Sequence, residues 1–231
     1  MAIDLTRKRS RPDPAIPPEL YDGARMDRKT FHRLYERTPA DFKAELIGGV
    51  VHMAAAMRVP HAEHAGLLRT WLTIYRFATP GVREAGEATV LLGDGSEPQP
   101  DGLLWIEGGK ADVDGRGYLA GAPEFVAEVA DATTAIDLGS KRSDYERHGV
   151  LEYLVLELRK RRAVWFVRDE RGGYVETAAD LEGLLKSHVF PGMWLDVKAF
   201  FRLDGNRVLD VLHRGLESPE HAAFVESLRS K

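Results

Sequence analysis

The stretch EFVAEVAD, residues 124–131, is typical of a buried strand, yet it carries one carboxylate on an otherwise apolar face. Side chains alternate between the two faces of a strand, so Glu128 shares a face with Val126 and Ala130, where an apolar residue is expected. A carboxylate that faces a core must be neutralised, hydrogen-bonded or bound to a cation, because an unpaired buried charge is strongly destabilising. The fold therefore has to supply partners for Glu128.

The composition limits the class of protein. With 231 residues and 44% apolar content, the chain is long enough to bury one substantial core. Its 32 basic and 36 acidic residues do not indicate a nucleic-acid-binding protein overall, so a polyanion would have to be held by a local patch. The lack of cysteine excludes disulfides, thiolate zinc sites and a cysteine nucleophile. No apolar run is long enough for a membrane span or a signal peptide, so we expect a soluble, cytoplasmic protein without membrane contact.

Hydrophobic periodicity predicts helices and strands in alternation. Helices are expected at residues 28–38, 60–79, 134–148 and 196–202 and near the C-terminus. Strands are expected for AELI and VVHM around a Gly48-Gly49 turn, and for EATVLLG, PDGLLWIE, PEFVAEVA, EYLVLEL and RAVWFVRD. This order predicts an α/β or α+β domain with a central mixed β-sheet flanked by helices.

Three parts of the chain are expected from composition and pattern. Residues 1–26 are basic and rich in proline, which is typical of a flexible arm. Residues 27–202 carry the periodic segments and form the predicted domain. Residues 203–231 form a C-terminal extension with an amphipathic helix.

A second carboxylate is expected close to Glu128. In the run QPD, Asp101 follows a proline and begins an apolar run, which puts it at the entrance of a strand that neighbours the Glu128 strand. Two carboxylates near the same end of adjacent strands would repel each other unless a divalent cation lay between them. Taken alone, an aspartate after a proline is common turn chemistry, and this alternative stays open for Asp101.

Two further residues complete the candidate site. Glu45 lies in AELIGG and shares a strand face with Ile47, although an exposed position on an edge strand is an alternative. In the helix after Glu128, helical spacing places Lys141 between Leu138 and Tyr145 on the side that leans on the sheet. Such a lysine is either a structural ion-pair partner of Glu128 or a catalytic group that orients water and stabilises developing charge. Together the residues predict a metal-assisted hydrolase.

Four runs of the sequence resemble, in order, the Uma family of restriction endonucleases, which belongs to the PD-(D/E)XK phosphodiesterase superfamily. They are AELIGGVVHM, QPDGLLWIE, GAPEFVAEVADATTAIDLGSKRSDYERHGVLEYLVLE and FPGMWLDVKAFF. The likeness covers residues 27–202 and is most specific over residues 121–153. It implies a restriction-endonuclease-like core. The lysine that usually follows the second acid by two residues is Ala130 here, and Lys141 matches the position that it takes in this family.

The resemblance implies a reaction and a set of roles. Glu45, Asp101 and Glu128 fall on the acidic positions of the nuclease site. Asp101, Glu128 and the backbone carbonyl of Val129 would bind Mg²⁺ or Mn²⁺, which prefer oxygen ligands. Lys141 would position the attacking water, and Glu45 would hold Lys141 or a second metal. DNA is the expected substrate, and a homodimer is expected on the pattern of superfamily members that cut two strands.

Departures from the family pattern keep a second hypothesis open. The family's SPST is replaced by a segment that begins with Asp131, whose charge either adds a ligand or weakens phosphate binding. The alternative to a nuclease is a catalytically inactive protein of the same fold that acts as a DNA-binding or regulatory module, with Glu128 and Lys141 as a structural pair. His61 and His64 are interpreted as structural rather than metal-binding, and the basic run 159–162 as a solvated turn.

Overall fold

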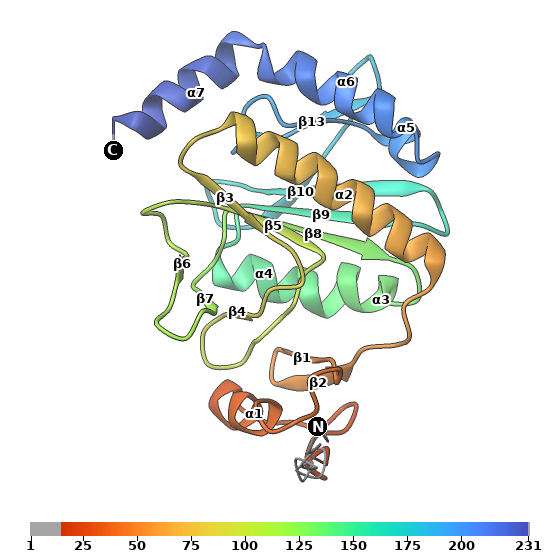
Figure 1. The fold of residues 1–231 in the computed structure, drawn as a ribbon, viewed down its shortest axis with the longest axis vertical. Coiled ribbons are helices and arrows are strands. Elements are labelled where there is room, and N and C mark those ends of the chain that lie inside the picture. Colours follow the sequence, from red (N-terminus) through yellow and green to blue (C-terminus); the bar gives the residue numbers. More distant parts are fainter. Residues whose placement is uncertain (1–14, 231) are drawn as a thin grey trace, which may run out of the picture.

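The computed structural model describes residues 15–230, and its centre is a six-stranded sheet in the order β11-β10-β9-β8-β5-β3 (Figure 1). These strands are β3 (Val82–Ala85), β5 (Gly102–Ile106), β8 (Phe125–Ala130), β9 (Glu152–Glu157), β10 (Arg162–Arg168) and β11 (Tyr174–Thr177). Only β8 and β9 pair in parallel, and every other neighbouring pair is antiparallel. The predicted mixed sheet is thus confirmed, with the Glu128 strand near its centre.

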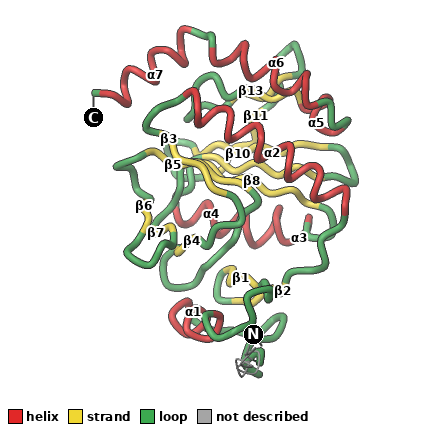
Figure 2. Tube along the Cα trace, viewed as in Figure 1, coloured by secondary structure: helices red, strands yellow, loops and turns green. Residues whose placement is uncertain are grey.

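Helices cover both faces of this sheet (Figures 1 and 2). One face carries α2 (Val59–Ala78) and α6 (Gly205–Leu216), and the other carries α3 (Thr134–Ile136), the π-helical turn η1 (Asp137–Lys141) and α4 (Arg142–His148). Because β8 and β9 are parallel, the chain must cross over between them, and this crossover is the segment that carries Lys141. The flanking helices confirm the predicted α/β architecture.

The two faces of β8 meet different cores, as its alternation predicts. Phe125 packs edge-on against Trp165, with ring centroids 5.6 Å apart, in the core under α2. Val126 and Ala130 lie in the opposite core with Tyr145 of α4. All six residues of β8 are buried, and Glu128 is the one charged side chain that this strand presents to the face covered by α4.

The N-terminal segments form a small separate layer. Helix α1 (Arg28–Tyr35) begins at Asp27, which accepts a hydrogen bond from the Thr30 amide, and the hairpin of β1 (Ala44–Ile47) and β2 (Val50–Met53) turns at the two predicted glycines. Both glycines have positive φ, which suits a tight hairpin turn. Backbone hydrogen bonds between Leu46 and Glu97, 3.3 and 2.7 Å long, tie β1 to the segment that leads into Asp101.

Part of the predicted arm is packed against this hairpin. Leu20 and Ala24 are buried, and the Val51 amide donates to the Ala24 carbonyl at 2.8 Å. Residues 1–14 of the predicted arm lie outside the described residues. At the other end of the chain, Val208 and Leu212 of α6 lie in the same core as α2, so the segment after residue 202 contributes to the main hydrophobic layer.

The remaining elements are short. They are β4 (Val90–Leu91), β6 (Asp112–Val113), β7 (Leu119–Ala120), β12 (Leu184–Lys186), β13 (Trp194–Asp196), α5 (Val197–Phe201) and α7 (Pro219–Arg229). The predicted strand EATVLLG supplies only β4, which lies in a separate small sheet with β7 and β6. The edge strand of the main sheet next to β5 is instead β3. This edge strand was missed because three of its four residues are exposed or half-buried, so it lacks an apolar alternation.

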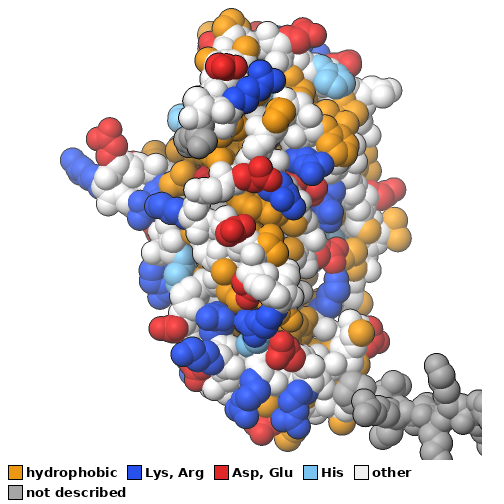
Figure 3. Space-filling view, turned by 60° about the vertical axis from the view of Figure 1, so that its left-hand side comes forward, with side chains coloured by type: hydrophobic (Ala, Val, Ile, Leu, Met, Phe, Trp, Pro, Cys, Tyr) orange, Lys and Arg blue, Asp and Glu red, His pale blue; other side chains and the backbone are white. Residues whose placement is uncertain are grey.

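Charged side chains of both signs are interspersed over the face in Figure 3, with apolar side chains visible between them. None of the helices among the described residues combines the length and the apolar character needed to cross a membrane.

Glu152 is a second buried carboxylate, and its role is structural. It begins β9 and is fully buried; its Oε2 accepts from Ser187 Oγ at 2.6 Å, and its Oε1 accepts from the amides of His188 and Val189 at 2.6 and 3.1 Å. Burial raises the pKa of Glu152, while these hydrogen bonds oppose the shift. The carboxylate therefore holds the turn that follows β12 against the sheet.

We predict that Glu152→Ala lowers the free energy of unfolding by about 3 kcal/mol, because it leaves buried donors without an acceptor. Urea denaturation measures the change. The control is Glu107→Ala, at a side chain that is 55% exposed, for which we expect a change of at most about 0.5 kcal/mol. Equal losses in the two variants would contradict a structural role for Glu152.

Candidate active site

The residues predicted for the site line one cavity of about 450 Å³. It lies between the β1–β2 hairpin, the start of α2, the end of β8 and the π-helical turn. Glu45, Asp101, Glu128, Val129 and Lys141 all contribute to its lining, although they are separated by up to 96 positions in the chain. The structure therefore brings every predicted site residue together.

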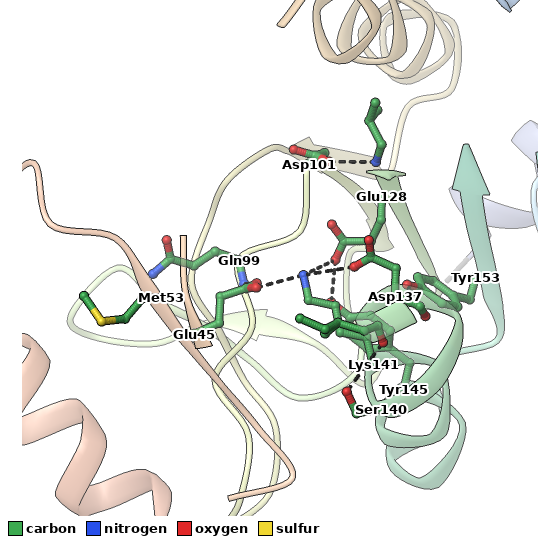
Figure 4. A network of polar contacts seen from close by, with 12 residues as sticks. Glu45, Met53, Gln99, Asp101, Glu128, Asp137, Ser140, Lys141, Tyr145 and Tyr153 are labelled. Atoms are coloured by element: carbon green, nitrogen blue, oxygen red, sulfur yellow. Dashed lines mark hydrogen bonds and ion pairs between the residues drawn. The ribbon is translucent and has the colours of Figure 1, made fainter. Parts of the chain in front are cut away.

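Lys141 is the centre of the polar network (Figure 4). Its Nζ lies 2.8 Å from Glu45 Oε2 and 2.9 Å from Glu128 Oε1, and 3.8 Å from Asp137 Oδ1. Burial disfavours the charge of Lys141, but the carboxylates of Glu128, Glu45 and Asp137 outweigh burial and raise the pKa of Lys141 well above its usual range. The side chain is therefore held as an ammonium ion.

Glu128 has two hydrogen-bond partners that stabilise its carboxylate on this buried strand. Its Oε1 accepts from Lys141 Nζ at 2.9 Å and from Tyr145 Oη at 3.1 Å. Burial raises the pKa of Glu128 well above its usual range, with Lys141 opposing the shift and the nearby acids adding to it. Its other oxygen, Oε2, accepts no hydrogen bond from a described residue. Glu128 therefore keeps one carboxylate oxygen on the cavity side that could act as a metal ligand.

Asp101 is fixed at the end of β8. The Val129 amide donates to Asp101 Oδ2 at 2.7 Å, and β5 pairs with β8 so that Gly102 lies opposite Ala127. The carbonyls of Glu124 and Ala130 accept hydrogen bonds from the β9 side. Successive carbonyls of a strand point alternately to its two neighbouring strands. The carbonyl of Val129, next to Ala130 in the chain, therefore points towards β5, on the side where Asp101 lies.

Glu45 joins the hairpin to the rest of the site. Its Oε1 accepts from the Gln99 amide at 2.6 Å while its Oε2 contacts Lys141. Gln99 is in turn held by its side chain, which donates to Tyr35 Oη at 3.0 Å. Glu45 thus connects β1, the segment before Asp101 and the crossover helix, and the alternative of an exposed edge-strand position is wrong.

The crossover helix differs from the regular helix predicted for residues 134–148. A π-helical turn occupies Asp137–Lys141, and such turns are frequent at functional sites. Both Asp137 and Lys141 are buried on the cavity side, and Tyr153 Oη donates to the Asp137 carbonyl at 3.0 Å. The sequence prediction places only Leu138 and Tyr145 beside Lys141, whereas an acid four residues before a lysine on a helix is the signal that indicates Asp137.

Two other predictions about this region have different outcomes. His64 is structural, as expected: it contacts the Pro60 carbonyl at 2.7 Å. His61 is not remote from the acids, because its Nε2 lies 3.4 Å from Asp101 Oδ1, and this contact raises the pKa of His61. Sequence patterns do not indicate this contact, since 40 positions separate the two residues.

Asp131 is neutralised by the basic turn. Arg159 Nε lies 2.8 Å from Asp131 Oδ1, and this guanidinium lowers the pKa of Asp131. Lys160 and Arg162 of the same turn pair with Glu157 and Glu176, at 2.7 and 3.0 Å. The charge that replaces the family's SPST motif is therefore compensated within the fold.

The side chains suit a hard divalent cation in their chemistry. Among the described residues, no group of three or more His, Cys, Asp or Glu side chains is arranged as a metal site. The predicted set uses two carboxylates and a main-chain carbonyl, all oxygen donors of the kind that Mg²⁺ and Mn²⁺ prefer. The cavity also holds more carboxylates than Lys141 alone can balance, namely Glu45, Asp101, Glu128 and Asp137.

Comparison with known proteins identifies the family. The model of the Uma2 family, described as "Putative restriction endonuclease", matches residues 28–198. The chain belongs to this family. The predicted resemblance over residues 27–202 is thereby confirmed.

The fold of this Uma2 family member also matches a solved structure. A "putative nuclease belonging to DUF820" from Anabaena variabilis aligns with a TM-score of 0.58 at 14% sequence identity, covering 74% of this chain and 97% of that chain. At this identity the match shows a shared fold, that of a nuclease-like domain. No curated protein matches the chain.

We predict that Lys141→Met lowers the free energy of unfolding by about 3–5 kcal/mol near pH 8, because it leaves buried carboxylates without their cation. Without Lys141 the pKa values of these carboxylates rise further above those of the unfolded chain, so the folded chain binds more protons than the unfolded chain. The stability of the variant therefore falls as pH rises, and its deficit relative to the wild type shrinks towards about pH 5.

Urea denaturation near both pH values tests this. Lys198→Met is the control, since Lys198 is exposed and forms no ion pair with a described residue. A deficit of Lys141→Met that stays the same at the two pH values would contradict the charge assignment.

Proposed function

We propose that the protein is an endonuclease that hydrolyses DNA phosphodiester bonds with the help of Mg²⁺ or Mn²⁺. The observation that carries this proposal is the convergence of Asp101, Glu128 and Lys141 on one cavity, in a chain of a restriction endonuclease family. None of the three is adjacent to another in the sequence, and each is held in place by a contact of its own. The arrangement matches what hydrolysis of a phosphate diester requires: oxygen ligands for a cation beside a fixed positive charge.

The roles follow from the position of each atom. Asp101, Glu128 and the Val129 carbonyl would hold the cation, which would supply an activated water and offset charge on the phosphate. Lys141 directs its ammonium group into the same cavity, where it can orient the water or stabilise developing charge. Glu45 fixes Lys141 from the hairpin side at 2.8 Å, and Tyr145 fixes Glu128 at 3.1 Å. Cutting both strands of a duplex would use two such sites, which is the reason for proposing a homodimer.

One observation favours a second candidate function. Lys141 is only 6% exposed and already contacts two carboxylates, as expected of a structural ion pair. In that case the chain would keep the nuclease fold as a DNA-binding or regulatory module without catalysis. The two candidates differ in metal binding, because the structural pair needs no cation.

We predict that wild-type protein binds Mn²⁺ in a calorimetric titration and nicks supercoiled plasmid, and that Glu128→Gln and Asp101→Asn each reduce the nicking rate at least about 100-fold. Both substitutions remove a charged oxygen ligand while keeping the size of the side chain. The matched control is Glu107→Gln, at an exposed acid outside the cavity, which should cut at the wild-type rate.

The outcomes separate the two candidates. Nicking that persists in both variants would contradict the site assignment. Wild-type protein that neither binds Mn²⁺ nor cuts DNA would support the module without catalysis.

A further inference from the structure

One wall of the cavity is an exposed apolar segment, residues 53–58 (MAAAMR), which we call the strap. The strap runs from the end of β2 to the start of α2 along the side of the molecule (Figure 1). Its ends are fixed, since the Ala54 amide donates to the Lys43 carbonyl and the Ala62 amide donates to the Arg58 carbonyl, both at 3.0 Å. The segment between these two anchors lines the cavity without being part of a helix or strand.

The strap presents apolar side chains to solvent beside the acids that line the cavity. Met53 and Met57 are 42% and 55% exposed, and the three alanines between them are exposed as well. All five line the same cavity as Asp101 and Glu128. Exposed apolar surface of this kind usually marks a contact with a ligand or a partner.

The cavity therefore has two sides of different chemistry. Oxygen ligands and Lys141 occupy one side, and the strap forms the other. Arg58 and His61 lie where the strap meets α2, and Arg58 is exposed and forms no ion pair with a described residue. A ligand that fits this arrangement carries a phosphate for the charged side and a flat apolar group for the strap, which describes a nucleotide.

The base of a nucleotide reaches such a wall only when it is unpaired. In a duplex, bases are stacked inside the helix, and an enzyme that contacts the face of one base must act on a single strand or take that base out of the stack. The cavity, at about 450 Å³, lies within the range of roughly 300–1,000 Å³ that holds small molecules, so it is larger than a phosphate requires. Alanine at three successive positions keeps this volume open, and methionine sulfur makes favourable contacts with aromatic rings.

We propose that the strap binds the base of an unpaired nucleotide whose phosphate lies at the carboxylates through the proposed divalent cation, so that the substrate is DNA with an unpaired base at the cut, as in a single strand or a bulge. This inference rests on the proposed nuclease function for the cutting step. The binding step is independent of hydrolysis, and it can be tested separately.

The test compares fluorescein-labelled DNA hairpins by fluorescence anisotropy in Ca²⁺, a divalent cation that stands in for Mg²⁺, and EDTA is the control that removes the cation and should weaken binding of all the hairpins. One hairpin is fully paired, one carries a single unpaired thymine in its stem, and one carries an abasic unit at the same place. We expect the unpaired thymine to strengthen binding about 10-fold over both other hairpins, in line with the upper end of the contact between a methionine sulfur and an aromatic ring. Ala55→Trp, which fills the cavity from the strap, should abolish this difference.

Two controls accompany Ala55→Trp. Ala178→Trp places the same side chain on an exposed loop outside the cavity and should keep the preference for the unpaired thymine. A Mn²⁺ titration of Ala55→Trp should match the wild type, because Ala55 supplies no side-chain ligand, and it shows that the carboxylates remain in place.

Equal affinity for the paired and unpaired hairpins would overturn the inference. Equal affinity for the thymine and abasic hairpins would also overturn it, since the distorted backbone rather than the base would then be bound. A preference for the unpaired thymine that Ala55→Trp removes would support it. If that preference occurs without any cutting in Mn²⁺, the recognition of the base stands and the proposed nuclease activity fails.

Discussion

The site depends on one buried ammonium group, that of Lys141. Its contacts with Glu128 and Glu45 join the central strand, the crossover helix and the N-terminal hairpin at a single point. Without a positive charge there, Glu128 would be an uncompensated carboxylate in the middle of an apolar face. The position of the hairpin relative to the sheet also depends on this charge, because Glu45 is bound both to Lys141 and to the Gln99 amide.

The sheet topology explains why the remaining groups arrive at the same place. The parallel pairing of β8 with β9 requires a crossover, and the crossover begins directly after the end of β8, so Lys141 returns towards Glu128. The antiparallel pairing of β5 with β8 brings the start of β5 to the same end, which places Asp101 at Val129. The chemistry of the site is thus determined by two strand pairings and one connection.

Much of this arrangement could be predicted because it depends on local pattern. The alternation in EFVAEVAD put Glu128 on the same strand face as Val126 and Ala130, and the proline before Asp101 located the start of β5. What could not be predicted depends on contacts between distant segments or on irregular backbone. The π-helical turn at Asp137–Lys141 is irregular backbone of this kind, and the contact between His61 and Asp101 joins residues that lie 40 positions apart in the chain.

The number of acids in the cavity bears on whether Lys141 and Glu128 form more than a structural pair. One carboxylate balances one ammonium group, and Glu45 already provides a second. Asp101 forms no ion pair with Lys141: it is held by the Val129 amide and by His61, and its charge raises the pKa of Glu128. Asp137 adds a further acid whose Oδ2 is buried without a hydrogen-bond partner among the described residues. Both acids raise the pKa of Glu128, because like charges in a buried site repel each other, and so they add to the cost of keeping Glu128 ionised. The repulsion is relieved when one of these buried carboxyls takes up a proton, and the proposed divalent cation would relieve it in the same way while leaving the carboxylates ionised.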